Sequence, residues 1–298
     1  MKILNLELLF KPASYTLINL KTFYNLNMVN NLRFELSFKD IPQLEKKIKF
    51  CISNKINKIN IPCKGVIKKE LLNQIIEYIG ENYKDLDVIY HYSLYHQYTK
   101  DRKTSYLEFI NFINKSNYYK NNEILLVSGS NKRKNFDVID VFKSLKDEKK
   151  IKNDFGIAYN PYLENYYGFC GEKVRLEKKI SSGLTKSIWL QFGTDINLLE
   201  SEIKFLKSSL NNLSNINHQD VKFYGSLLIP SRQFISRFKF RPWRGVYISD
   251  KYLNSLENFN SFTKDLIQIY FDNNICPLIE TDSSSLEKLE NVYSFFYK

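Results

Sequence analysis

Eight short apolar runs, each followed by an amphipathic pattern of helical period, succeed one another from Leu32 to the C-terminus. Behind the sixth run, for example, Leu199, Ile203, Leu206 and Leu210 recur at spacings of three and four. Strands that alternate with helices favour a parallel sheet, and eight such repeats in 298 residues predict a single closed (β/α)8 TIM barrel. The expected strands cover residues 32–38, 58–61, 88–92, 124–127, 156–159, 188–192, 221–228 and 275–279.

The chain shows no Gly- or Ser-rich linker that would divide it, so we expect one barrel domain over residues 32–298 after an N-terminal segment, residues 1–31. A doubly wound open sheet is the main rival, but it needs a Gly-rich turn after its first strand, and none is present. Residues 1–31 lack the compact apolar core of a signal peptide. An organellar presequence stays open beside the simpler reading of a segment that packs on the barrel floor.

The net charge of +12 raises the possibility of a nucleic-acid partner, but the lysines are spread along the whole chain. A solvated surface or the steering of an anionic ligand explains this spread better, so no nucleic-acid partner is expected. The lack of a long apolar run predicts no membrane partner either. The four cysteines are far apart and form no CxxC pair, which predicts neither a zinc site nor a disulfide framework. No run approaches the roughly 20 apolar residues of a membrane helix, and a reducing, cytoplasmic location fits.

Two side chains at expected strand ends are candidates for acid–base chemistry. Glu35 lies inside an apolar run, where a carboxylate must be paired, hydrogen-bonded or protonated, so it is a candidate general acid or a satisfied interior group. His91, one of three histidines, lies between two tyrosines and is by default a structural group. In a barrel, active residues lie at the carboxyl ends of strands, so both side chains are expected at the same mouth.

The stretch from Arg175 to Asp195 joins a basic helix to a strand that ends on an amide. We expect a helix from Glu172 to Ser182, stopped by Gly183, and then a buried strand that ends at Gln191. A polar amide at that position would face a ligand in the barrel mouth.

Taken in order, these residues resemble the methylenetetrahydrofolate reductase family. The elements of the resemblance are Phe34-Glu35, His91, Ser128-Gly129-Ser130, Ala158-Tyr159, the spacing Leu176-x-x-Lys179-x-x-x-Gly183, and then Gln191. The match runs loosely from Leu32 to the C-terminus, and its specificity lies in the order of the motifs rather than in any one of them.

The resemblance implies a flavoprotein that uses FAD, reduced by NADH or NADPH, to convert 5,10-methylenetetrahydrofolate to the 5-methyl form. It implies Glu35 as the general acid and Gln191 as a contact of the folate and of the nicotinamide, with Ser130 at a second substrate-binding position. Its implied FAD-binding residues are His91, Gly129, Tyr159, Glu172 and Lys179.

One departure from that family opens alternatives. The family carries Arg-Gly-Asp where this chain has Ser128-Gly129-Ser130, and a serine supplies no charge. A divergent folate one-carbon-binding barrel that has lost FAD or changed its reaction therefore stands beside the reductase, as does a pseudoenzyme that binds a partner. A nucleic-acid binder is a further alternative that rests on the net charge alone. The choice of NADH or NADPH and the formation of a homo-oligomer stay open.

Overall fold

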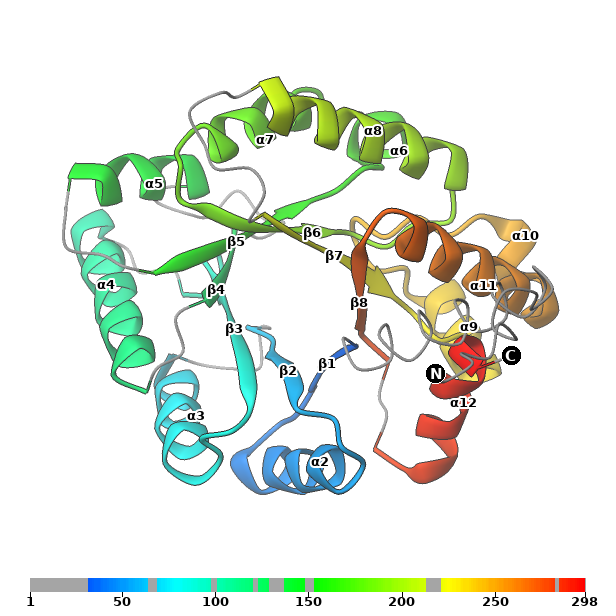
Figure 1. Cartoon of the computed structure of the whole chain (residues 1–298), viewed down its shortest axis with the longest axis horizontal. Coiled ribbons are helices and arrows are strands. Elements are labelled where there is room, and N and C mark those ends of the chain that lie inside the picture. Colours follow the sequence, from blue (N-terminus) through cyan, green and yellow to red (C-terminus); the bar gives the residue numbers. More distant parts are fainter. Residues whose placement is uncertain are drawn as a thin grey trace, which may run out of the picture.

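The structure, a computed structural model, describes residues 32–63, 69–97, 101–119, 123–128, 137–147, 153–212, 221–281 and 284–297. The predicted N-terminal segment, residues 1–31, lies outside this range, as do Gly129 and Ser130. Eight parallel strands follow one another around a closed barrel, and β8 pairs with β1 to close it. Figure 1 shows the helices surrounding this ring of strands. The predicted TIM barrel is confirmed.

The strands are β1 (Arg33–Glu35), β2 (Lys58–Ile61), β3 (Asp87–Ser93), β4 (Glu123–Val127), β5 (Asp154–Tyr159), β6 (Thr185–Leu190), β7 (Lys222–Leu227) and β8 (Ile275–Ile279). Six helices, each behind its strand, are α2 (Ile41–Ser53), α3 (Lys69–Asn82), α4 (Arg102–Tyr118), α5 (Val138–Asp147), α8 (Ile196–Asn212) and α12 (Leu286–Tyr297). Two helices follow β5, namely α6 (Leu163–Tyr167) and α7 (Glu172–Ile180). Three follow β7, namely α9 (Arg232–Phe240), α10 (Asp250–Leu253) and α11 (Leu256–Asp272).

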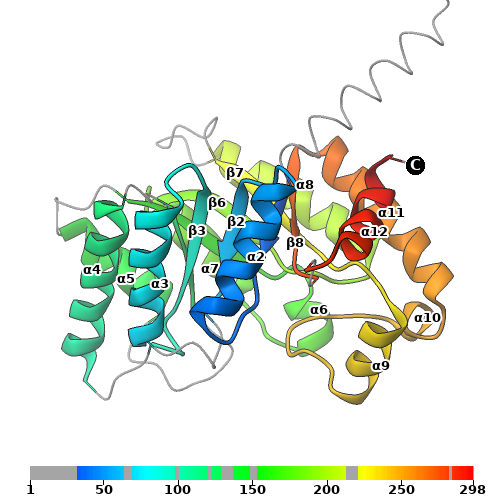
Figure 2. The same cartoon turned by 90° about the horizontal axis from the view of Figure 1, so that it is seen from below.

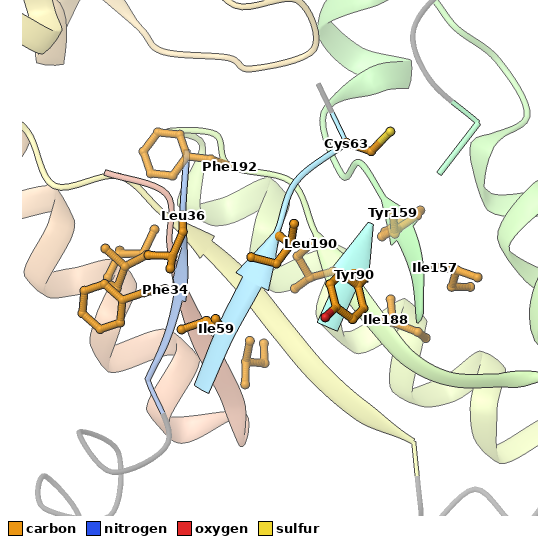
Figure 3. Close-up of a cluster of buried hydrophobic side chains, with 14 of the residues drawn as sticks. Phe34, Leu36, Ile59, Cys63, Tyr90, Ile157, Tyr159, Ile188, Leu190 and Phe192 are labelled. Atoms are coloured by element: carbon orange, nitrogen blue, oxygen red, sulfur yellow. The ribbon is translucent and has the colours of Figure 1, made fainter. Parts of the chain in front are cut away.

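The main core lies between the strands and the outer helices. Every second side chain of a strand points outward into this layer, as Phe34, Ile59, Tyr90, Ile157 and Ile188 do, and each is at most 2 % exposed (Figure 3). Burial of these side chains against the amphipathic helices supplies the main driving force for the fold. The periodic apolar residues of the sequence are the ones buried in this layer.

A smaller apolar cluster fills the inside of the barrel. It consists of Ile89, Leu125, Trp189, Tyr224 and Leu278, from strands around the ring. Because strands alternate their faces, these are the inward positions, and the barrel is a packed core rather than a pore.

Several predicted boundaries differ from the structure by one to three residues, and two of these differences have a clear physical reason. The first strand was expected over residues 32–38 but ends at Glu35, because the apolar run continues through buried Leu36 and Phe38 after strand pairing has stopped. The helix expected from Glu172 to Ser182 ends at Ile180, and Gly183 follows with a φ of 76°, the left-handed conformation that favours glycine. Within the described ranges, no helix has the length and apolar character needed to cross a membrane.

Candidate active site at the mouth of the barrel

Three polar side chains from consecutive strands meet inside the barrel near the carboxyl ends of the strands. Glu35 is the last residue of β1, Asn60 lies on β2 and His91 on β3. The Asn60 amide nitrogen lies 2.9 Å from His91 Nε2, and His91 Nδ1 lies 3.9 Å from Glu35 Oε2. The Glu35 and His91 side chains are 5 % and 12 % exposed, so this group is largely shielded from water. The sequence placed Glu35 and His91 at one mouth, and the structure brings them together.

Arg33 anchors this group from below. Its Nε donates a 2.8 Å hydrogen bond to Asn60 Oδ1, and its Nη1 forms a 2.9 Å ion pair with Asp87. Its Nη2 donates to the backbone carbonyls of Ile59 and Asp87, and the guanidinium also lies 5.8 Å from the centre of the Tyr224 ring. Arg33 is 1 % exposed, and these contacts satisfy the charge that its burial would otherwise leave without partners.

These contacts determine which nitrogen of His91 carries the proton. An arginine Nε–H can only donate, so the Asn60 atom that faces it must be the carbonyl oxygen. The other end of the same amide, its NH2 group, therefore faces His91 and donates to Nε2. Because Nε2 accepts this bond, a neutral His91 holds its proton on Nδ1, on the side of Glu35. The chain from Arg33 through Asn60 thus presents an N–H group at the mouth.

Aromatic rings form the floor beneath His91. The His91 and Trp189 rings lie edge to face at 6.4 Å, and Trp189 stacks on Tyr224 at 3.9 Å. Trp189 Nε1 donates to Ser187, whose hydroxyl donates to the buried carboxylate of Glu123. Burial raises the pKa of Glu123, and the Ser187 hydrogen bond opposes that rise. These rings fill the barrel interior beneath His91.

Two further strand ends offer polar groups whose hydrogen-bonding capacity is unused within the described residues. Gln191, directly after β6, is half-buried, and only its backbone nitrogen is bonded, to the carbonyl of Tyr159 at 2.9 Å. The Ser128 hydroxyl, directly after β4, is buried and has no hydrogen-bond partner among the residues described. A buried hydroxyl without a partner is costly, which indicates a position that a ligand can satisfy.

A second carboxylate lies on the other side of β1. Ser226, on β7, donates a 2.6 Å hydrogen bond to Glu280, which follows β8. The next residue, Thr281, accepts a 2.7 Å hydrogen bond from the backbone nitrogen of Ile229. These contacts fix the loops after β7 and β8 against each other.

Tyr159, a predicted cofactor-binding residue, points away from the mouth. Its hydroxyl donates a short hydrogen bond to Glu202 on α8, and Lys173 pairs with the same carboxylate at 2.8 Å. Burial and then the bond to Glu202 hold the pKa of Tyr159 well above its ordinary value. This tyrosine therefore fastens α8 and α7 to the barrel.

Lys179 and Glu172, two other predicted cofactor-binding residues, lie together on α7. Lys179 Nζ donates to the backbone carbonyl of Ala158 at 3.2 Å and lies 3.8 Å from Glu172 Oε1. The Lys179 and Glu172 side chains are only 6 % and 10 % exposed. Glu172 also lies 3.7 Å from Arg175. Protein groups surround both charges, so their visible role is to dock α7 on β5.

Sequence reasoning missed Asn60 and Arg33. The alternation in Lys58-Ile59-Asn60-Ile61 places Asn60 on the inward face of its strand, so its position could have been predicted from the sequence. The contact between Arg33 and Asn60 depends on register, since Phe34 and Glu35 pair with Ile59 and Asn60. Among the residues described, no three His, Cys, Asp or Glu side chains cluster as a metal site would.

No protein-family model matches the chain, and no curated protein matches it. Among solved structures, it is similar to an aldo/keto reductase from Klebsiella pneumoniae in complex with NADP and acetate, at 7 % identity and a TM-score of 0.50, covering 90 % of this chain and 86 % of the other. A thermostable aldo-keto reductase in complex with the inhibitor epalrestat shows 12 % identity and a TM-score of 0.49, covering 90 % of each chain. At such low identity the likeness shows the shared barrel fold alone.

The predicted relationship to methylenetetrahydrofolate reductase is wrong, because no family model matches the chain and the barrel solved with NADP, at a TM-score of 0.50, is an aldo/keto reductase. FAD, the flavoprotein reaction and the folate substrate were implied by that relationship alone and fall with it, as do the divergent folate-binding and pseudoenzyme alternatives. The motifs behind the resemblance are short, and any TIM barrel presents single polar residues at its strand ends. Three of the residues that carried the resemblance have contacts within the protein instead. These residues are Tyr159, Glu172 and Lys179.

Proposed function

We propose that this chain is a nicotinamide-dependent oxidoreductase that reduces a carbonyl group at the mouth of the barrel. The observation that carries the proposal is the pair of His91 Nδ1–H and the Glu35 carboxyl, 3.9 Å apart and largely buried. That separation is too long for a direct hydrogen bond, so both groups can converge on one atom of a third molecule. The barrel solved with NADP and acetate supports the choice of cofactor class.

In this proposal the two side chains have distinct roles. The neutral His91 donates a hydrogen bond from Nδ1 to the carbonyl oxygen, which polarises the carbonyl and stabilises the negative charge that develops on it. Glu35, in its protonated form, gives its proton to that oxygen as the carbon is reduced, and then recovers a proton from solvent. The floor of Trp189 and Tyr224 keeps water out from below.

The residues at the mouth fit a nicotinamide. When bound, the cofactor supplies the hydride that reduces the carbonyl carbon. Its carboxamide needs one acceptor and one donor partner, and the side-chain amide of Gln191 can serve as both. The Ser128 hydroxyl, buried without a partner among the described residues, can satisfy a further polar atom of the cofactor.

The test is the loss of reduced-nicotinamide absorbance when the purified protein is offered a panel of aldehydes and ketones. We expect Glu35→Gln, which keeps the size of the side chain, to lower turnover by about 100-fold or more while cofactor binding, followed by fluorescence, changes little. Glu257→Gln, at an exposed position on α11, is the matched control and should behave as the unmodified protein.

Two results would overturn this proposal. If the unmodified protein binds neither NADPH nor NADH, the nicotinamide assignment is wrong. If it turns over and Glu35→Gln turns over equally fast, Glu35 is not the proton donor.

A further inference from the structure

A basic segment at the mouth carries arginines that the rest of the fold does not use. Half of the chain's eight arginines, Arg232, Arg237, Arg241 and Arg244, lie on α9 and the loop after it. All four are exposed, and none has a side-chain hydrogen bond or ion pair in the part of the chain that the structure describes. No acidic residue occurs between Leu228 and Ser249, so the positive charge has no local compensation.

Two exposed aromatic side chains lie among these arginines. Phe240, the last residue of α9, is 91 % exposed, and Trp243 is 43 % exposed. Trp243 packs edge to face against Phe234 and Phe238, which fixes its ring on the helix and leaves its other parts in solvent. An almost fully exposed phenylalanine beside unpaired cations is unusual for a surface that contacts only water. We call Arg232–Arg244 the basic aromatic segment.

The chain that follows the basic aromatic segment is fastened to the barrel mouth. The Asn160 side chain donates to the carbonyl of Gly245, and the Tyr167 hydroxyl donates to that of Val246. Tyr247 forms a bridge with Gly193, in the loop after β6. Figure 2 shows α9 projecting beyond the barrel on the same side as α6. The segment is therefore a projection held in place rather than a loose loop.

We propose that the basic aromatic segment binds anionic phospholipid bilayers at their surface. The unpaired guanidinium groups pair with lipid phosphates, while Phe240 and Trp243 enter the boundary between headgroups and acyl chains. A projecting helix end suits a flat surface, whereas proteins that hold single-stranded nucleic acid track it along a groove. This surface differs from the expectation of no membrane partner, which rested on the lack of an apolar run long enough to cross a membrane. It does not depend on the proposed reductase activity.

The experiment is sedimentation of the full chain with vesicles of phosphatidylcholine, with and without phosphatidylglycerol. We expect binding only to the anionic vesicles, and weaker binding as salt is raised. The chain has two tryptophans, and Trp189 is buried inside the barrel, so quenching by brominated lipid reports on Trp243. Quenching on anionic vesicles alone is the expected result.

Matched variants separate the contributions of charge and apolar surface. Arg237→Ala with Arg241→Ala should lower the bound fraction by on the order of tenfold, whereas Lys204→Ala with Lys207→Ala, an equal charge loss on α8, should change it little. Phe240→Ser should abolish most of the binding, and Leu107→Ser, at a 51 % exposed position on α4, should not.

Three results would overturn the proposal. The first is an absence of binding to anionic vesicles. The second is equal loss in the arginine and lysine variants, which would indicate attraction by net charge alone. The third is tight binding to single-stranded RNA or to NADPH that the arginine variant loses while vesicle binding is absent, which would assign the segment to those ligands.

Discussion

The two sides of the barrel interior are built by different means. On the side of β1 to β3, Arg33, Asn60 and His91 form a chain of hydrogen bonds that determines the orientation of the Asn60 amide and the tautomer of His91. On the side of β6 and β7, Trp189 and Tyr224 fill the space by stacking. Hydrogen bonds specify direction, whereas stacked rings tolerate small changes. The first side therefore carries the proposed chemistry, and the second supports it.

The largest effect is expected from Arg33→Met, which removes the anchor of the polar side. The buried Asn60 Oδ1 and the carbonyl oxygen of Ile59 would lose their donor, so the free energy of unfolding should fall by about 2–4 kcal/mol. The control is Arg175→Met, because Arg175 forms a 2.8 Å ion pair with Asp137 that is partly exposed and should contribute about 1 kcal/mol or less. Urea unfolding measures both, and equal losses would contradict the role of Arg33.

On the stacked side, Gly156→Ala should lower the free energy of unfolding by less than Arg33→Met does. A Cβ at this position would lie 2.5 Å from Trp189 Nε1 and 2.7 Å from Ser187 Oγ, so we expect destabilisation of about 1–3 kcal/mol. Trp189→Phe removes the clashing nitrogen, so the double variant should lose less stability than the two single variants added together. If the stability losses of the two single variants add up in thermal unfolding, the Trp189 side chain is not the reason that position 156 requires a glycine.

The smallest expected effect is a pH dependence of the free energy of unfolding that comes from Cys51, on α2 in the outer layer. Burial raises the pKa of this thiol from 9.0 to about 12. Below pH 9.0 the thiol is neutral in both states and its contribution is complete; as pH rises above that value only the unfolded chain ionises, so stability falls until about pH 12.

Comparison with Cys51→Ala isolates this contribution, because buried tyrosines such as Tyr90 act in the same direction in both proteins. We expect the unmodified protein to lose more stability than the variant between about pH 8 and about pH 10. Equal losses in urea unfolding at the two pH values would contradict the assignment.

The outer layer of the fold could be predicted from the sequence, because the residues buried between strands and helices are apolar and recur at regular spacings. Lys58–Ile61 and Ile275–Ile279 were predicted with their observed bounds. Glu35 and His91 could be placed at one mouth for the same reason. Their link through Asn60 and Arg33 could not, since it depends on strand register and on the choice of partner for each buried polar group. Tyr159 ends its strand as predicted, but strand position alone did not show that its hydroxyl bonds to α8.

The hydrogen-bond chain from Arg33 through Asn60 places the proton of a neutral His91 on Nδ1, directed at Glu35. Nitrogen NMR of the histidine side chains measures this directly, and the His91 signals are those missing from His91→Phe. We expect a protonated Nδ1 and an unprotonated Nε2 in the unmodified protein, with a mixture of tautomers once Asn60→Leu removes the donor. A proton on Nε2 in the unmodified protein would contradict the hydrogen-bond chain and the role proposed for His91.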